Sequence, residues 1–366
     1  MSGVTAIEPG AETGRSTSGR RFRAARRRRP AGLLPLAVAL AVLLLAEVAV
    51  GAGRSQLDEP EVWPTPELQK KFAQIEQRAE GGRQPEIVLV GDSMMDAGGD
   101  PAALAGAVPG TTVYNAAIAG ETLPVVADWT TRIVQPRLEP KVVVIGFSSN
   151  ELNPSVLAPE TGLGAYRSSR VVRAAEGRGS PVDRADAFLR EHSMLYRYRS
   201  SLRRPFSDQV ADPDVFDPDL TPDGQGLAFT NLGYLEKDGA AQAQAVIQGV
   251  IAALAGFTVG LENVTILQEM IRTIRVRGAR VLLVAMPVTD DLIAAHPKGE
   301  ADYAKAMEAF AGAAGRSGAT FVQPGIWPSP LFADPVHLNG VGAAQLTAYL
   351  APLVQQEVAA ARLSTP

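Results

Sequence analysis

The chain has 366 residues, of which 46% are hydrophobic and 20% charged, a composition typical of a globular protein rather than a disordered one. Its net charge is −4 and no basic stripe runs through its body, so there is no electrostatic reason to expect nucleic-acid binding. The chain has no cysteine, which excludes disulfides, thiolate metal sites and a cysteine nucleophile.

The N-terminal residues predict a membrane-spanning segment and its orientation. Residues 1–30 combine a Gly-, Ser- and Thr-rich start with a block of arginines, and we expect a disordered, basic cytoplasmic tail. Residues 31–53 form one apolar segment, with Glu47 its only charge, that at about 1.5 Å per residue can cross a hydrocarbon core of about 30 Å. It is either an uncleaved signal anchor or a long signal peptide cut near residues 50–53, and its length favours the anchor. Both interpretations place the chain after about residue 54 outside the cytoplasm.

The rest of the chain divides into a short segment and one domain. Residues 54–84 contain three prolines and a polar stretch with one helical pattern, and predict a juxtamembrane spacer. We therefore expect the folded domain to cover residues 85–362. Within it, residues 151–258 predict a long insertion over the site. The aspartates at 211–226 do not follow the EF-hand pattern and predict a solvated loop rather than a calcium site.

Short apolar runs in the domain predict buried strands. They lie at residues 86–90, 111–115, 141–147, 280–286 and 319–323. Helical patterns alternate with these runs, for example at residues 261–278 and 342–362. Such alternation predicts an α/β fold, with a mostly parallel five-stranded sheet covered by helices on both faces. Ligands of such sheets bind beyond the carboxyl ends of the strands, so we expect the polar residues after the strands to converge there.

A serine follows the first predicted strand on a tight turn. GDSMM at residues 91–95 places Ser93 where a hydroxyl can attack an acyl carbon while backbone N–H groups hold the developing oxyanion. Asp92 and Ser93 are also common as turn formers and helix N-caps, so this motif alone leaves both interpretations open.

A serine nucleophile needs a base, and the chain has three histidines, His192, His296 and His337. His337 lies three residues after Asp334 in ADPVHLNG, so the carboxylate can accept from Nδ1 and leave Nε2 facing the serine. A polar loop that caps the last helix would have a similar sequence. We expect His192 to be structural and His296 to lie on a surface loop.

Together these motifs resemble the ordered blocks of the SGNH or GDSL hydrolase family. The blocks are GDSMM, NAAIAG at 115–120, GFSSNE at 146–151 and DPVH at 334–337. The resemblance implies a flavodoxin-like α/β/α fold, with Ser93 as nucleophile and Asp334 and His337 as its partners. It also implies an oxyanion hole made by Ser93, Gly120 and Asn150, and no metal or organic cofactor.

The blocks depart from the family's usual pattern at three positions. Met94 stands where leucine is usual, and Ser148 and Glu151 stand where glycine and aspartate are usual. A side chain at position 148 is expected to crowd the backbone beside the oxyanion hole. Trp327 either walls an acyl pocket near His337 or packs beneath its loop.

A second, weaker resemblance lies in the predicted insertion. HSMLYRYRSSL at 192–202 is similar to a segment of membrane-anchored SGNH-like proteins of the alginate-acetylation and teichoic-acid D-alanylation type. It would give Tyr196, Arg197 and Arg199 to a groove for an anionic glycan. The alternative is an amphipathic helix with its arginines facing outward.

These observations predict an extracytoplasmic serine esterase that removes small O-acyl groups, such as acetyl, from cell-envelope glycans or lipids. One alternative is an O-acyltransferase that uses the same residues to modify an extracellular polysaccharide. Another is a catalytically idle protein that binds a glycan or serves as a scaffold. The expected partners are an acylated glycan or lipid, the membrane through residues 31–53, and a polytopic acyl-exporting membrane protein, but no nucleic acid.

Overall fold

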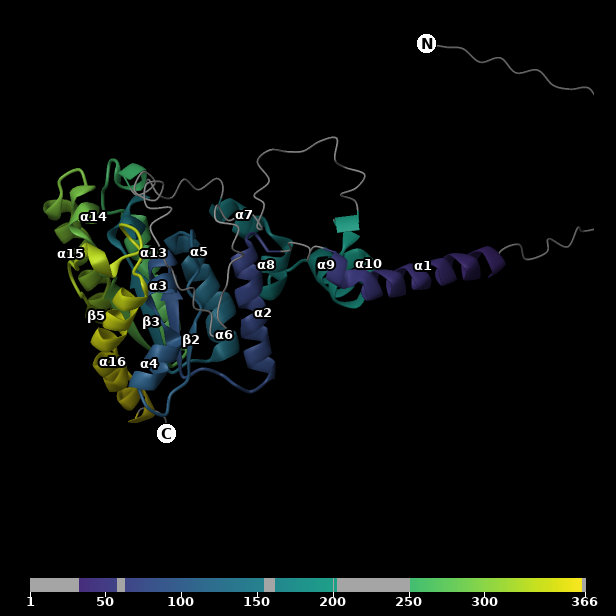
Figure 1. Ribbon diagram of the computed structural model, residues 1–366, viewed down its shortest axis with the longest axis horizontal. Helices are drawn as coiled ribbons and strands as arrows, with labels where there is room; N and C mark the ends of the chain where they lie inside the picture. The colour runs from purple at the N-terminus through teal and green to yellow at the C-terminus, as the bar shows by residue number, and fades with distance from the viewer. Residues whose placement is uncertain (1–32, 58–62, 155–161, 200, 203–250, 364–366) are drawn as a thin grey trace, which may run out of the picture. The chain divides into compact units, whose positions relative to one another are not determined.

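A computed structural model describes residues 33–57, 63–154, 162–199, 201–202 and 251–363 of the chain (Figure 1). The chain divides into two units, Met1–Arg54 and Ser55–Pro366. The predicted tail at residues 1–30 and the aspartate-rich loop at 211–226 lie outside the described residues.

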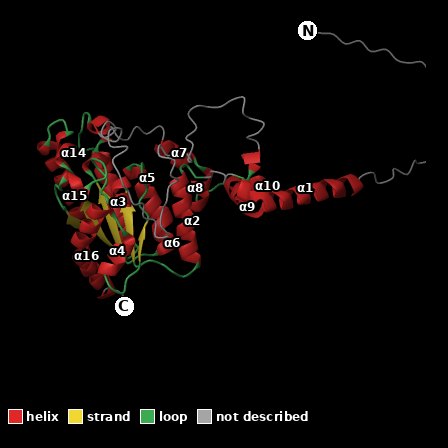
Figure 2. Ribbon diagram, in the orientation of Figure 1, coloured by secondary structure: helices red, strands yellow, loops and turns green. Residues whose placement is uncertain are grey.

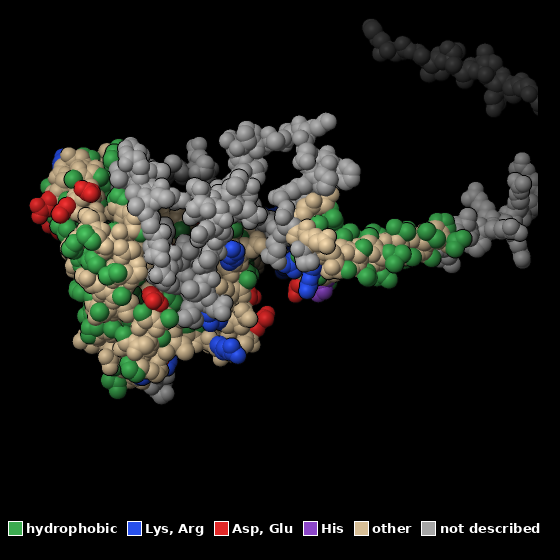
Figure 3. Space-filling view, viewed as in Figure 1, with side chains coloured by type: hydrophobic (Ala, Val, Ile, Leu, Met, Phe, Trp, Pro, Cys, Tyr) green, Lys and Arg blue, Asp and Glu red, His purple; other side chains and the backbone are tan. Residues whose placement is uncertain are grey.

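The first unit contains one long apolar helix, α1 (Leu33–Gly53). Among the described residues, it is the helix long and apolar enough to cross a membrane. Its apolar side chains are exposed along its length, including Leu34 at 76% and Leu45 at 70% (Figure 3). The helix matches the predicted apolar segment at residues 31–53, whose orientation and cleavage stay predictions.

The second unit is built on five strands at the predicted places. They are β1 (Ile87–Gly91), β2 (Val113–Asn115), β3 (Val142–Phe147), β4 (Arg280–Ala285) and β5 (Thr320–Val322). All neighbouring strands are parallel, in the order β2-β1-β3-β4-β5. Figure 2 draws this sheet in yellow. The order is that of flavodoxin-like sheets, so the predicted fold class is confirmed.

Helices cover both faces of this sheet, which gives the predicted three layers (Figures 1 and 2). One layer contains α3 (Ser93–Gly98), α4 (Pro101–Ala107) and α16 (Gly340–Leu363), and α16 contacts β3 and β4. The other contains α5 (Leu123–Asp128), the π-helical turn η2 (Trp129–Val134), α6 (Gln135–Leu138), α13 (Leu261–Val276) and α15 (Glu300–Ser317). The apolar strands are therefore shielded from water on both sides.

Shorter helices follow the strands or lie in the predicted insertion. They are η3 (Ser149–Leu152), α7 (Gly162–Ser168), α8 (Arg170–Ala175), α9 (Pro181–His192), α10 (Met194–Arg197), α14 (Asp290–Ala294) and η5 (Ser329–Leu331). The described part of the insertion is thus helical, and residues 203–250 of it lie outside the described range.

The helix α2 (Pro66–Glu80) corrects the predicted spacer. Its Leu68 and Ile75 are fully buried, and Trp63 just before it is 7% exposed, with its ring centroid 4.5 Å from that of Phe72. Residues 63–80 are therefore part of the folded domain rather than a spacer before it. The pattern was misleading because charged and amide side chains outnumber the few buried apolar ones in this helix.

Two glycines bring the end of β1 close to β3. Gly91, with φ +152°, pairs with Gly146, and a Cβ on Gly91 would lie 2.1 Å from the Gly146 carbonyl oxygen. A Cβ on Gly146 would in turn lie 2.3 Å from Cε of Met95. This close approach of β1 and β3 determines where Asp92 and Ser93, the next residues after Gly91, lie at the end of the sheet.

We expect the substitution Leu68→Ala to lower the free energy of unfolding of the detergent-solubilised chain by about 2–5 kcal/mol, because it leaves a cavity in the core. Urea unfolding followed by tryptophan fluorescence measures the change, with Lys70→Ala on the exposed side of α2 as the control. Equal stability of the two variants would show that α2 is a spacer after all.

Candidate active site

Ser93 is the first residue of α3, directly after β1. Asp92 is the N-cap of this helix, and its Oδ1 accepts a hydrogen bond from the Met94 N–H at 2.9 Å. Because Asp92 rather than Ser93 caps the helix, the Ser93 hydroxyl is available for another partner. Asp92 is 5% exposed, and burial raises its pKa to about 6 against the lowering effect of the backbone N–H groups it accepts from.

His337 and Asp334 lie in the loop before α16 and meet Ser93 there. His337 Nε2 lies 2.9 Å from Ser93 Oγ, and its Nδ1 lies 2.6 Å from Asp334 Oδ2. The second oxygen, Asp334 Oδ1, accepts from the backbone N–H groups of Val336 and His337, each at 2.9 Å. A carboxylate at Nδ1 assigns the ring hydrogen to that nitrogen, so Nε2 is the acceptor for the serine hydroxyl.

The hydrogen bonds also keep Asp334 ionised. Burial alone would raise the pKa of this carboxyl, but the hydrogen bond and charge of His337 and the two backbone N–H groups lower it below its usual value. His337 itself is only 7% exposed. The aspartate is thus a fixed negative partner for an imidazolium that forms beside it.

Gly120 and Asn150 lie at the same edge of the sheet. The segment that carries Gly120 continues the pairing of β1, since Ala116 N–H donates to Leu89 at 2.8 Å and Ile118 N–H donates to Gly91 at 3.0 Å. Gly120 has φ +72°, a conformation that favours glycine. Asn150 follows β3, the other neighbour of β1. The structure thus brings all five predicted residues to the carboxyl edge.

The altered third block has an ordinary backbone at this edge. Ser148 has φ −105° and ψ 175°, a conformation that any residue can adopt, so the backbone here does not require the usual glycine. Its side chain is 1% exposed and its hydroxyl has no hydrogen-bond partner in the described part of the chain.

Glu151 connects the two predicted oxyanion-hole segments, a role that its sequence position did not reveal. Its Oε1 accepts from Asn150 Nδ2 at 3.2 Å, and its Oε2 accepts from the Leu123 N–H at 2.8 Å. The side chain is buried, and burial together with the nearby charge of Asp92 raises its pKa well above the usual value. Only the fold shows this link, because Leu123 lies 28 residues earlier.

His296 corrects another prediction, since it is not on the surface. It is 3% exposed, and its Nε2 lies 3.0 Å from Ser149 Oγ while its Nδ1 lies 3.0 Å from the Leu292 carbonyl oxygen. Its ring also meets Phe257 edge-on at 4.8 Å. Ser149 is 147 residues away in sequence, so the local motif AAHPKG contains no sign of this contact.

The aromatic and arginine residues of the second resemblance pack against their own helices. The Tyr196 hydroxyl donates to Asp186 at 2.5 Å, and the Arg199 guanidinium lies 3.9 Å from the Tyr196 ring centroid. Arg197 lies 5.8 Å from the Tyr198 ring centroid. These contacts favour the amphipathic-helix interpretation over a groove for a glycan.

His192 and Trp327 also have packing contacts. The His192 ring stacks on Phe188 at 4.1 Å and its Nδ1 lies 2.9 Å from the Phe188 carbonyl oxygen, as expected for a structural residue. Trp327 is 8% exposed and belongs to the hydrophobic core, and its backbone N–H donates to the Val288 carbonyl oxygen at 2.8 Å. Its burial favours the packing interpretation over a wall of an acyl pocket.

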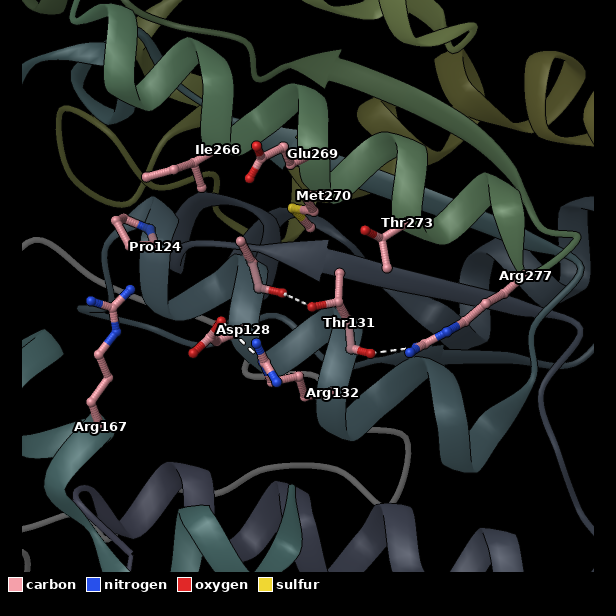
Figure 4. A pocket seen from close by; sticks show the side chains of 11 residues that line it. Pro124, Asp128, Thr131, Arg132, Arg167, Ile266, Glu269, Met270, Thr273 and Arg277 are labelled. Atoms are coloured by element: carbon pink, nitrogen blue, oxygen red, sulfur yellow. Dashed lines mark hydrogen bonds and ion pairs between the residues drawn. The ribbon is translucent and has the colours of Figure 1, made fainter. Parts of the chain in front are cut away.

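A cavity of about 390 Å³ lies elsewhere, between α5, η2, α7 and α13 (Figure 4). None of the five site residues lines it. Two arginines that line the cavity interact with other lining residues: Arg132 pairs with Asp128 at 3.4 Å, and Arg277 donates to the Thr131 carbonyl oxygen. We assign it no role. Among the described residues, no group of three or more His, Asp or Glu side chains could hold a metal ion.

Comparisons with known proteins give only distant similarities. No protein-family model and no curated protein matches the chain. The chain is similar to the crystal structure of a carbohydrate acetylesterase family member from Sinorhizobium meliloti, with 12% identity, a TM-score of 0.34, and coverage of 75% of this chain and 99% of that one.

Two further solved structures show similar values. For a candidate arylesterase from Agrobacterium tumefaciens the identity is 13% and the TM-score 0.32, with 74% of this chain and 99% of that chain covered. For an acetyl xylan esterase from Butyrivibrio proteoclasticus they are 10% and 0.28, with 73% and 64% covered. We draw no conclusion from similarities of this size.

The buried carboxyl group of Glu121, next to Gly120, should make the stability of the fold depend on pH. Glu121 is 8% exposed, and burial raises its pKa from 4.5 to about 7. Because the folded-state pKa is the higher one, the unfolded chain loses this proton first, and stability falls as the pH rises from 4.5 through about 7.

We therefore expect Glu121→Gln to be more stable than the wild type at pH 8, by about 1–3 kcal/mol, and close to it at pH 4.5. Urea unfolding at the two pH values measures the difference. A difference that does not change with pH would rule out the raised pKa.

Proposed function

We propose that the chain is a serine hydrolase of carboxylic esters, with Ser93, His337 and Asp334 as its catalytic triad. The proposal rests on two hydrogen bonds that link the three side chains. Ser93 Oγ lies 2.9 Å from His337 Nε2, and His337 Nδ1 lies 2.6 Å from Asp334 Oδ2. A hydroxyl in this setting can transfer its proton to the imidazole as it attacks an acyl carbon. The resemblance to the SGNH or GDSL family points to the same roles.

The oxyanion that forms in this attack needs hydrogen-bond donors. We assign this role to the Ser93 N–H in the first turn of α3, the Gly120 N–H and the Asn150 side chain. One Nδ2 hydrogen of Asn150 is directed at Glu151, and the amide has a second for a ligand. Donors fixed before the reaction stabilise the charge as it develops.

The reaction then runs in two balanced steps. Ser93 Oγ bonds to the acyl carbon, His337 takes its proton, and the tetrahedral intermediate expels the alcohol, which receives that proton from His337 Nε2. Water next gives a proton to His337 and attacks the acyl-enzyme, and collapse returns the proton to Ser93 and releases the acid. Asp334 stays ionised throughout and stabilises the imidazolium.

We place this chemistry outside the cytoplasm and assign small O-acyl groups on cell-envelope glycans or lipids as substrates. The proposal rests on α1, which is apolar enough to cross a membrane, and on the arginine block before it in the sequence. A tethered enzyme of this kind acts on acyl groups within reach of the membrane. The membrane and the acylated glycan or lipid are then its partners.

The same residues support acyl transfer if a sugar hydroxyl replaces water in the second step. A polytopic acyl-exporting membrane protein would then be the donor's source. The idle alternative receives less support, because Ser93, His337 and Asp334 are already hydrogen-bonded to one another.

We expect Ser93→Ala to abolish hydrolysis of a chromogenic acetyl ester by the solubilised full chain, and Asn150→Ala to lower kcat by about 10²–10³-fold, the usual effect of one oxyanion donor. Steady-state kinetics, with thermal unfolding as a check on folding, measure both. Ser148→Ala is the matched control, since it removes a buried hydroxyl without a hydrogen-bond partner beside the same asparagine, and should keep activity within a few-fold.

Full activity of Ser93→Ala, or of Asn150→Ala, would overturn these assignments. Addition of a polysaccharide acceptor separates the two acyl chemistries. A transferase would divert the acetyl group into the polysaccharide at the expense of free acetate, whereas a hydrolase would release the same amount of acetate with or without the acceptor.

A further inference from the structure

A fully buried lysine lies behind the candidate site. Lys71, in the middle of α2, is 0% exposed, and its ammonium donates to the Asp96 carboxylate and to the Ala117 carbonyl oxygen. Its Nζ also lies 3.5 Å from Oε1 of Glu67, one turn earlier. Lysine is almost never fully buried without such partners, because the charge must be taken out of water.

Two of these partners, Asp96 and Ala117, belong to the segments that carry the proposed nucleophile and oxyanion hole. Asp96 lies in α3, three residues after Ser93. Ala117 lies in the segment that leads to Gly120, and Glu67 Oε1 accepts from the N–H of Ala119 in the same segment at 2.9 Å. One helix therefore holds a carbonyl oxygen and an N–H of the three residues that precede Gly120.

The contacts above hold the residues before Gly120 rather than Gly120 itself. It is exposed, its φ is +72°, and a Cβ built on it would have no atom within 4 Å. Its conformation therefore depends on the residues on either side. Glu67 and Lys71 hold the side before it, and Glu151 holds the side after it through the Leu123 N–H at 2.8 Å.

The cluster is arranged so that it adds little net charge beside a developing oxyanion. Burial, and the Asp96 charge after it, raise the pKa of Glu67 to about 8, against the lowering effect of Lys71. Near neutral pH Glu67 thus keeps its proton, and the ion pair of this cluster is the one between Lys71 and Asp96. A buried ion pair of this kind is weak evidence for stability, since apolar residues of similar volume often serve as well.

We infer that Lys71 and Glu67 are positioning residues, which hold residues 117–119 so that the Gly120 N–H faces the acyl oxygen on Ser93. The inference rests on the proposed function and adds α2 to its machinery. It differs from a purely structural role, in which the pair would affect the stability of the fold but not the rate of the chemical step.

The test compares Lys71→Met with Lys70→Met in the full chain, in detergent, with the chromogenic acetyl ester. The two lysines are neighbours on α2, but Lys70 is exposed. We expect Lys71→Met to lower kcat by about 10²-fold with little change in KM, the effect of a donor displaced by about 1 Å, and Lys70→Met to leave both unchanged. The loss should be smaller when Asn150→Ala is also present, because both changes impair one oxyanion hole.

A second pair of variants covers the case in which Lys71→Met fails to fold. Glu67→Gln replaces a carboxyl that is protonated near neutral pH by an amide of the same size and keeps an acceptor for the Ala119 N–H, whereas Glu67→Met removes the acceptor. We expect Glu67→Gln to keep kcat within a few-fold and Glu67→Met to lower it at least tenfold at equal KM.

Each result leads to a separate conclusion. If the wild type shows Ser93-dependent turnover and the folded variants Lys71→Met and Glu67→Met keep its kcat, the positioning role is wrong and the proposed function stands. If the wild type shows no turnover that depends on Ser93, the proposed function fails and the positioning role fails with it. Multiplicative losses in the Lys71→Met, Asn150→Ala double variant would also overturn the positioning role, because they indicate independent effects.

Discussion

The hydrogen bond from Ser93 to His337 joins two residues that are 244 positions apart. It exists because β1 lies near the centre of a parallel sheet whose strands all end at the same edge. Gly91 and Gly146 allow β1 and β3 to come close at this edge, and the turn of Asp92 and Ser93 starts from there. The geometry of the site is therefore set by the sheet, and the loops contribute side chains to a place that is already fixed.

Much of this arrangement could be predicted from the sequence, because the strands are apolar runs and each polar motif follows one of them. The strands, the layers and the convergence of polar residues at one edge required only the alternation of elements and the rule that parallel strands end together. The grouping of Ser93 with His337 and Asp334 also required the resemblance to the SGNH or GDSL blocks. The roles of these residues in catalysis stay a prediction, which kinetics must decide.

The residues that the sequence did not reveal are polar ones that the fold buries. Lys71 and Glu67 resemble the solvent side of an amphipathic helix, and only the partners on α3 and before Gly120 show that they face inward. The same is true of His296, whose partner Ser149 is distant in sequence. Periodicity reports apolar burial, so a buried charge or imidazole with distant partners leaves no trace in it.

The position of α2 also affects what happens when the chain is cut by a protease. Residues 54–65 separate it from α1, and residues 81–86 separate it from β1. A break in the stretch that precedes Trp63 separates α1 from α2 and leaves the buried side chains of α2 in place. A break between α2 and β1 leaves α2 attached by non-covalent contacts alone, and its departure would uncover the core and leave the Asp96 carboxylate without the Lys71 ammonium. If α1 is the membrane anchor that we propose, release of the domain and loss of α2 follow from cuts in two stretches that only the 15 residues of α2 separate.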